Sequence, residues 1–211
     1  MNHFTLTVLA VAALAGSARA GIVYTVQQRS ITATASAALG NIVDTHSLSA
    51  TDFAPFNQSI EALAVDPNSG VNGWGRAYQD SALEPLLIRA NGGWAGGRTG
   101  QGCGGGGTSS FSVTFLLDAP ADYTFQSNVQ NALNLFSGPD GFSINQPGTF
   151  SGTLQPGEYS IQAYSSGQAS FPPSGDGFNL QLTITPTPGT FGLAVLGGCI
   201  AIRRQRPGTR A

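Results

Sequence analysis

The strongest constraint on the fold of this chain is a period-two alternation of apolar and polar residues that recurs through its middle. In residues 178–184, Phe, Leu, Leu and Ile alternate with Asn, Gln and Thr. This pattern is typical of a β-strand that buries one face and exposes the other. The alternation is equally clear in 111–117 and 158–164, shorter in 123–126, and weaker in 22–26 and 29–37.

Residues that favour turns separate these segments at short intervals. Sequences such as Pro-Gly and Asp-Gly occur at 118–120, 139–141, 147–148, 156–157 and 176–177. Strands with such punctuation predict an all-β fold, a single antiparallel β-sandwich over residues 21–185. Residues 81–90, around Pro85, fit either a short helix or an irregular strand, and we favour the strand.

Residues 149–159, TFSGTLQPGEY, resemble a strand–turn–strand element common in bacterial extracellular jelly-roll domains. On this interpretation Leu154 ends one strand, Pro156 and Gly157 form the turn, and Tyr159 begins the next strand. The resemblance implies a jelly-roll-like sandwich. It implies no activity, because domains of this kind carry many functions.

The N-terminal residues have the layout of a signal peptide. An apolar run covers residues 4–16, and Ala18 and Ala20 then match the small-x-small pattern of a cleavage site. Before the run, only His3 and the terminal amine can be positive. We expect residues 1–20 to form a helical signal peptide whose removal leaves Gly21 first. A buried N-terminal helix is the alternative.

The C-terminal segment 186–211 begins with two prolines and continues as a short apolar helix. Pro186 and Pro188 end the preceding strand, because proline cannot donate to a sheet ladder. The apolar run of twelve residues, 191–202, spans about 18 Å as a helix, short of the roughly 30 Å hydrocarbon core. We therefore expect this run to hold the protein in the inner membrane only transiently, and not to serve as a permanent anchor.

This tail resembles the PEP-CTERM sorting signal of exported bacterial proteins. Its motif consists of Pro186, Thr187, Pro188 and Gly189. The arginines that hold its end in the cytoplasm are Arg203, Arg204 and Arg206. The resemblance implies recognition and cleavage by a membrane protease of the exosortase type, although Thr187 stands where the family has glutamate. A plain tail anchor is the alternative.

The region between the two ends is acidic, and the chain has no lysine. Residues 21–185 hold eleven acidic side chains and four arginines, a formal charge of −7. This charge argues against nucleic acid as a partner, because nucleic-acid recognition needs a basic surface. The two cysteines, Cys103 and Cys199, lie in segments that we expect to separate, so no structural disulfide is predicted.

Catalytic motifs are weak. Residues 100–105 match a dinucleotide-binding pattern, but a strand follows and the glycines oppose the helix that such a site needs. We expect a flexible surface loop there. His46 has Asp44, Ser47 and Ser49 nearby, which are the ingredients of a nucleophilic triad, but no nucleophile elbow accompanies them. We predict no catalytic residue.

Metal ligands are also sparse. One histidine and one cysteine in the central region cannot make a closed zinc site of the usual composition. The turn residues Asp118, Asp122, Asp140 and Asp176 have the oxygen ligands that calcium prefers, but no calcium-binding pattern is present. We predict no metal site or cofactor, with calcium as the alternative.

Three aromatic residues, Trp74, Tyr78 and Trp94, lie in polar, glycine-rich sequence, unlike the phenylalanines of the alternating segments. If exposed, their rings are suited to stacking on sugars. The commoner fate of such residues is to pack the end of a sandwich. Exposure of the rings decides between the two.

The sequence therefore predicts an exported, non-enzymatic protein of the cell surface or extracellular matrix. Its processing partners are signal peptidase and an exosortase-type protease, with transient contact to the inner membrane. A carbohydrate-binding module for exopolysaccharide is the first alternative, and it requires Trp74 or Trp94 to be exposed. An extracellular hydrolase is the second alternative, and it requires a cleft that joins His46 to a serine and an acid.

Overall fold

The structure, a computed structural model, describes residues 21–129, 135–169 and 171–187. Within these ranges the chain is all-β, with no α-helix and no helix long and apolar enough to cross a membrane. The compact unit runs from Ala20 to Thr187. The expected signal peptide, the motif residues Pro188 and Gly189, and the terminal arginines lie outside the described residues.

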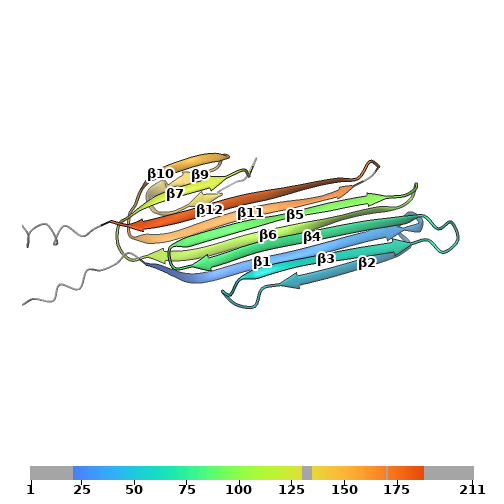
Figure 1. Ribbon diagram of the computed structural model, residues 1–211, viewed down its shortest axis with the longest axis horizontal. Helices are drawn as coiled ribbons and strands as arrows, with labels where there is room; N and C mark the ends of the chain where they lie inside the picture. Colours follow the sequence, from blue (N-terminus) through green and yellow to red (C-terminus); the bar gives the residue numbers. More distant parts are fainter. Residues whose placement is uncertain (1–20, 130–134, 170, 188–211) are drawn as a thin grey trace, which may run out of the picture. The chain divides into compact units, whose positions relative to one another are not determined.

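Two six-stranded antiparallel sheets form a β-sandwich (Figure 1). The first sheet has the order β2-β1-β6-β11-β8-β9. Its strands are β1 (Ile22–Ala37), β2 (Ile42–Ser49), β6 (Gly104–Leu117), β8 (Phe136–Ser137), β9 (Ser143–Ile144) and β11 (Gly157–Ala169). The short 3-10 turns η1 (Ala38–Gly40) and η2 (Pro139–Gly141) follow β1 and β8.

The second sheet has the order β10-β7-β12-β5-β4-β3. Its strands are β3 (Phe56–Val65), β4 (Asn72–Glu84), β5 (Leu87–Arg98), β7 (Ala121–Ser127), β10 (Gly148–Leu154) and β12 (Ser174–Pro186). Several strands have 12 to 16 residues, about twice the usual length. The start of β1 and the end of β12 lie at the same end of the sandwich (Figure 1).

The predicted strands are confirmed where apolar residues alternate. Phe111, Val113, Phe115 and Leu117 are buried in β6, and the apolar residues of 178–184 are buried in β12. The two weaker segments, 22–26 and 29–37, belong to one strand, β1, with an irregularity between Tyr24 and Val26. Residues 81–90 are also strand: β4 ends at Glu84 and β5 begins at Leu87, so Pro85 lies in a two-residue turn.

Two predictions at glycines were wrong. The loop expected at residues 100–105 ends at Cys103, and residues 104–107 instead form the start of β6 and pair with β1, with 105–107 also pairing with β11. Asp176 and Gly177, expected in a turn, lie within β12 and pair with Trp94 and Gly93 of β5. In both cases the glycines lie where another strand approaches closely, a role that depends on the missing side chain.

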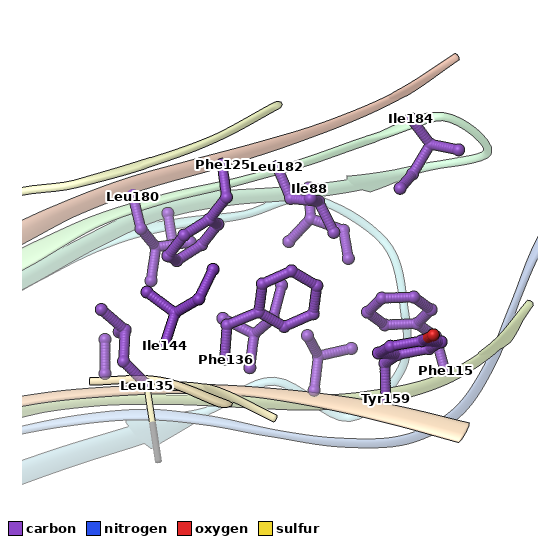
Figure 2. Close-up of a cluster of buried hydrophobic side chains, with 14 of the residues drawn as sticks. Ile88, Phe115, Phe125, Leu135, Phe136, Ile144, Tyr159, Leu180, Leu182 and Ile184 are labelled. Carbon is purple, nitrogen blue, oxygen red and sulfur yellow. The ribbon is translucent and has the colours of Figure 1, made fainter. Parts of the chain in front are cut away.

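One half of the sandwich has a core of aromatic and large aliphatic side chains (Figure 2). We call it the aromatic half. Phe136 lies at its centre, with ring centroids 5.0 Å from Phe142, 5.1 Å from Phe125 and 5.9 Å from Tyr159. Offset and edge-to-face contacts of this kind add to the stabilisation from burial.

The other half, which we call the glycine half, contains residues 31–37 of β1, 72–77 of β4, 92–98 of β5 and 104–109 of β6. A Cβ atom on Gly105 would lie 1.8 Å from the carbonyl oxygen of Trp74 in the opposite sheet. One on Gly73 would lie 2.1 Å from the carbonyl oxygen of Gly104. The sheets therefore meet backbone to backbone, whereas facing sheets usually pack about 10 Å apart.

Candidate functional site

Trp74 and Tyr78 lie on the outer face of the second sheet, within β4. Their neighbours Gly73, Gly75 and Ala77 are buried and point inward, so the even-numbered residues of this stretch point outward. Tyr78 is 37% exposed and Trp74 is half-buried. Because the two residues are four positions apart on a strand, their Cα atoms are separated by about 13 Å. We call this pair the aromatic platform.

Glycines of the neighbouring strands lie beneath both rings. A Cβ atom on Gly97 of β5 would lie 2.8 Å from Nε1 and 3.0 Å from Cε2 of Trp74. The hydroxyl of Tyr78 would lie 2.9 Å from a Cβ on Gly93 and 3.1 Å from one on Gly177. The rings can therefore lie close against the sheet, because the residues beneath them have no side chains.

A shallow pocket of about 300 Å³ adjoins the Trp74 ring. It is lined by Asp44, Glu61, Ala62, Leu63, Trp74 and Gly75. Glu61 of β3 lies 3.7 Å from the guanidinium of Arg76, and Arg76 donates a hydrogen bond of 3.1 Å to Ser59. The pocket therefore combines an aromatic residue and an exposed aliphatic side chain with two carboxylates, and the Arg76 guanidinium lies beside one of these carboxylates.

Asp44 connects the edge strands of the two sheets at this pocket. One carboxylate oxygen accepts a 2.9 Å hydrogen bond from the backbone N–H of Leu63 on β3. The other lies 3.1 Å from Nε2 of His46, whose side chain is 56% exposed. Asp44 thus satisfies a donor of an edge strand that would otherwise be open to pairing with another chain.

Trp94 is inside the sandwich and does not belong to the platform. It is 8% exposed, and its ring covers Gly167 of β11, where a Cβ would lie 2.1 Å from the indole. Its Nε1 has no hydrogen-bond partner among the described residues. Of the three aromatic residues that the sequence proposed for sugar stacking, the structure leaves Trp74 and Tyr78 accessible.

The residues around His46 do not assemble into a triad. Asp44 and His46 share one face of β2, whereas Ser47 and Ser49 point to the opposite face. The Ser47 hydroxyl lies 3.0 Å from that of Thr32 on the neighbouring strand. Asp44 and His46 have a structural explanation instead, because Asp44 joins the edge strands β2 and β3.

The aspartates considered as calcium ligands are dispersed, and three of them accept hydrogen bonds within the domain. Asp122 accepts from Thr153, Asp118 accepts from the backbone nitrogen of Gly21, and Asp176 accepts from Gly177. In the described part of the chain, no three His, Cys, Asp or Glu side chains gather in a way suited to a metal ion. The calcium alternative therefore has no assembled ligand set in these residues.

A second pocket, of about 290 Å³, lies over the loop between β2 and β3. The buried guanidinium of Arg29 organises this loop, since it donates to the carbonyl oxygens of Asp52 and Ala54 and to Ser81. Burial lowers the pKa of Arg29. All of these contacts lie within the protein, so we regard Arg29 as structural.

Comparison with protein families, curated proteins and solved structures gives no match. The site therefore rests on its geometry. Sequence reasoning found Trp74 and Tyr78, named Asp44 only as a neighbour of His46 in a possible triad, and missed Glu61 and Leu63. The register of β3 on β4 pairs Leu63 with Trp74 and Glu61 with Arg76, and a single sequence carries no direct signal for that register.

Proposed function

We propose that this chain is an exported, non-enzymatic protein of the cell surface or extracellular matrix, and that its aromatic platform binds a neutral polysaccharide. The observation that carries the proposal is the Trp74 ring on its glycine floor beside a polar pocket. A flat indole with one face toward the protein offers its other face to a sugar ring. The two carboxylates of the pocket, and the Arg76 guanidinium beside Glu61, can bond to sugar hydroxyls.

The charge of the domain favours an uncharged polymer. Residues 21–185 carry a formal charge of −7 and no lysine, so an acidic polysaccharide meets repulsion over most of the surface. Glu61 and Asp44 at the pocket add to this repulsion. A neutral polysaccharide avoids the repulsion and can still hydrogen-bond to both carboxylates.

Export and sorting remain part of the proposal, together with the jelly-roll-like character of the sandwich and the two processing enzymes. The backbone nitrogen of Gly21 lies 3.0 Å from a carboxylate oxygen of Asp118. Cleavage after Ala20 turns this nitrogen into an ammonium group that the carboxylate can pair with. At the other end, Thr187 donates to the carbonyl oxygen of Pro120, directly before the proposed cleavage region.

Intact mass and cell fractionation of the protein from its own cells test export. The proposal predicts loss of residues 1–20 and of the segment after about Pro188, with the product outside the inner membrane. A full-length tail embedded in the inner membrane would instead make this a simple anchored protein.

Retention in native gels that contain hydroxyethyl cellulose, dextran or mannan tests polysaccharide binding, with alginate as the acidic control. We expect retention by at least one neutral polymer and none by alginate. Trp74→Ala should weaken binding of a matching hexasaccharide at this face at least about tenfold, since central aromatic contacts are typically worth more than about 1.4 kcal/mol.

The buried-indole variant Trp94→Phe serves as the matched control and should keep its affinity. If Trp74→Ala and the unmodified chain bind the hexasaccharide with equal affinity, the aromatic platform is not part of the binding site. If no neutral polymer retains the unmodified chain, polysaccharide binding is rejected, whatever the result of the mass measurement.

A further inference from the structure

The outer face of the first sheet differs from the face that carries the platform. Its outward residues on β2, β1, β6 and β11 are mostly serine, threonine and glutamine. Among the described residues of this face, the only side chain charged at neutral pH is Glu158, at one end of β11. The platform face carries six charged side chains: Glu61, Arg76, Asp80, Glu84, Arg89 and Asp122.

Strand register arranges the hydroxyl groups of the first sheet in rows. One row contains Ser47, Thr32, Thr108 and Ser166, which are successive cross-strand partners. The next row contains Ser49, Ser30, Ser110 and Tyr164. The backbones of neighbouring residues within a row are about 4.8 Å apart and the two rows about 7 Å apart, because strand spacing and residue rise set these distances.

Tyr164 is the exposed aromatic residue of this array. Its side chain is 62% exposed, with Gln162 and Ser166 on either side of it along β11. Ser110 is its partner on β6. An accessible ring surrounded by hydroxyl and amide groups has the same chemistry as the aromatic platform, with no charge nearby.

The two faces lie back to back. Gln79, next to Tyr78, donates across the sandwich to the carbonyl oxygen of Ser110, the strand partner of Tyr164. Tyr78 and Tyr164 therefore lie at the same level on opposite outer faces. A polymer on one face cannot reach the other without passing around the sandwich.

We propose that the Tyr164 face is a second binding surface for a neutral, hydroxyl-rich polysaccharide, so that one molecule bridges two polymer chains. The absence of charge selects this occupant, because an uncharged face on an acidic domain matches an uncharged polymer. The proposal takes its ligand class from the proposed function. It adds a second site and a cross-linking activity.

Stoichiometry and bridging, measured on the full chain, test the proposal. The probes are the neutral polymer that retains the protein and its hexasaccharide. Calorimetric titration should give two hexasaccharide sites per chain for the unmodified protein, and one each for Tyr164→Ala and Trp74→Ala. Light scattering with the polymer should show cross-linked polymer aggregates for the unmodified protein, and only separate polymer chains with bound protein for either variant.

Leu116→Ala is the matched control, because Leu116 is 41% exposed on the same face but lies six residues from Ser110 along β6. It should keep two sites and full bridging. If titration finds one site per chain and Trp74→Ala abolishes it, the second surface is rejected and the proposed function stands. Loss of binding only in Tyr164→Ala would instead overturn the platform.

Self-association is the remaining outcome. If sedimentation velocity without polymer shows a dimer that Tyr164→Ala dissociates, then a second copy of the chain occupies this face and the proposal is wrong. A monomer in both proteins, together with two hexasaccharide sites, supports the proposal.

Discussion

The aromatic half and the glycine half of the sandwich solve the problem of joining two sheets in opposite ways. In the aromatic half, large side chains such as Phe136 and Phe115 fill the space between the sheets. In the glycine half, side chains are absent at Gly73, Gly105 and Gly107, so the sheets meet at their backbones. Burial of apolar area is therefore concentrated in the first half.

The difference shows how this chain separates stability from binding. In the glycine half, small residues also lie on the outer surface, where Gly93, Gly97 and Gly177 leave room for the rings of Trp74 and Tyr78. The half that contributes less to the hydrophobic core thus carries the flat aromatic surface. Four predictions test this division, ordered from the largest expected effect to the smallest.

Phe136→Ala should have the largest effect, because Phe136 contacts five other aromatic rings in the aromatic half. We expect a loss of about 3–5 kcal/mol in the free energy of unfolding, from lost burial and from the cavity that remains. Urea denaturation followed by circular dichroism measures it. A loss below about 1 kcal/mol would mean that this half is not the stabilising core.

Gly105→Ala should cost about 3 kcal/mol, at the upper end for overpacking, because the new Cβ overlaps a carbonyl oxygen of the opposite sheet. Gly104→Ala is the matched control. Its Cβ would meet nothing closer than 3.6 Å, from Ser36 Oγ. The same denaturation experiment should therefore show almost no loss for Gly104→Ala. Equal effects at the two positions would contradict the backbone-to-backbone packing.

Ser165→Ala should stabilise the protein by up to about 1 kcal/mol, because its hydroxyl is buried without a hydrogen-bond partner among the described residues. Ser165 lies on β11 and pairs with Ser109 of the glycine half. Ser81→Ala provides the contrast, since the Ser81 hydroxyl accepts a 3.3 Å hydrogen bond from Arg29. That substitution should destabilise the protein by about 1–2 kcal/mol. In thermal denaturation, the melting temperature should rise for Ser165→Ala and fall for Ser81→Ala.

The smallest effect concerns Asp66, in the turn between β3 and β4. Hydrogen bonds from the Ser69 hydroxyl and the Asn68 backbone lower the pKa of Asp66. Its contribution to stability is therefore present above the pKa of the unfolded chain, about 3.9, and is lost as pH falls through the lower folded value. Asp66→Asn should flatten this loss of stability at acid pH, measured by denaturation curves taken between roughly pH 5 and pH 2.

Much of the fold could be predicted from the sequence, because apolar alternation marks the strands of the aromatic half. Residues 111–117 and 178–184 show it clearly. The glycine half was missed because an inward glycine has no apolar side chain, so Gly105 and Gly107 leave no alternation to detect. Proline and glycine pairs predicted most turns, but Gly177 lies in a strand, where a Cβ atom would lie 2.8 Å from the carbonyl oxygen of Gly92 on the neighbouring strand.

The candidate site was predicted only in part, because Trp74 and Trp94 lie in similar sequence. On β5, Ile88 and Ala90 point inward, so Trp94, an even number of residues further along, also points inward. On β4, Ala77 and Gly75 lie on the inward face, so Trp74, an odd number of residues from both, points outward. Leu63 and Glu61 depend on strand register, which is set by the pairing of β3 with β4.

Quenching of tryptophan fluorescence tests the central claim most directly, because the two indoles lie on opposite sides of one sheet. In Trp94→Phe only the Trp74 signal remains, and in Trp74→Phe only that of Trp94. With the hexasaccharide of the polymer that retains the protein, we predict that acrylamide quenching of Trp74 decreases while that of Trp94 stays low and unchanged. Unchanged quenching of Trp74 in the presence of saturating sugar would contradict the account.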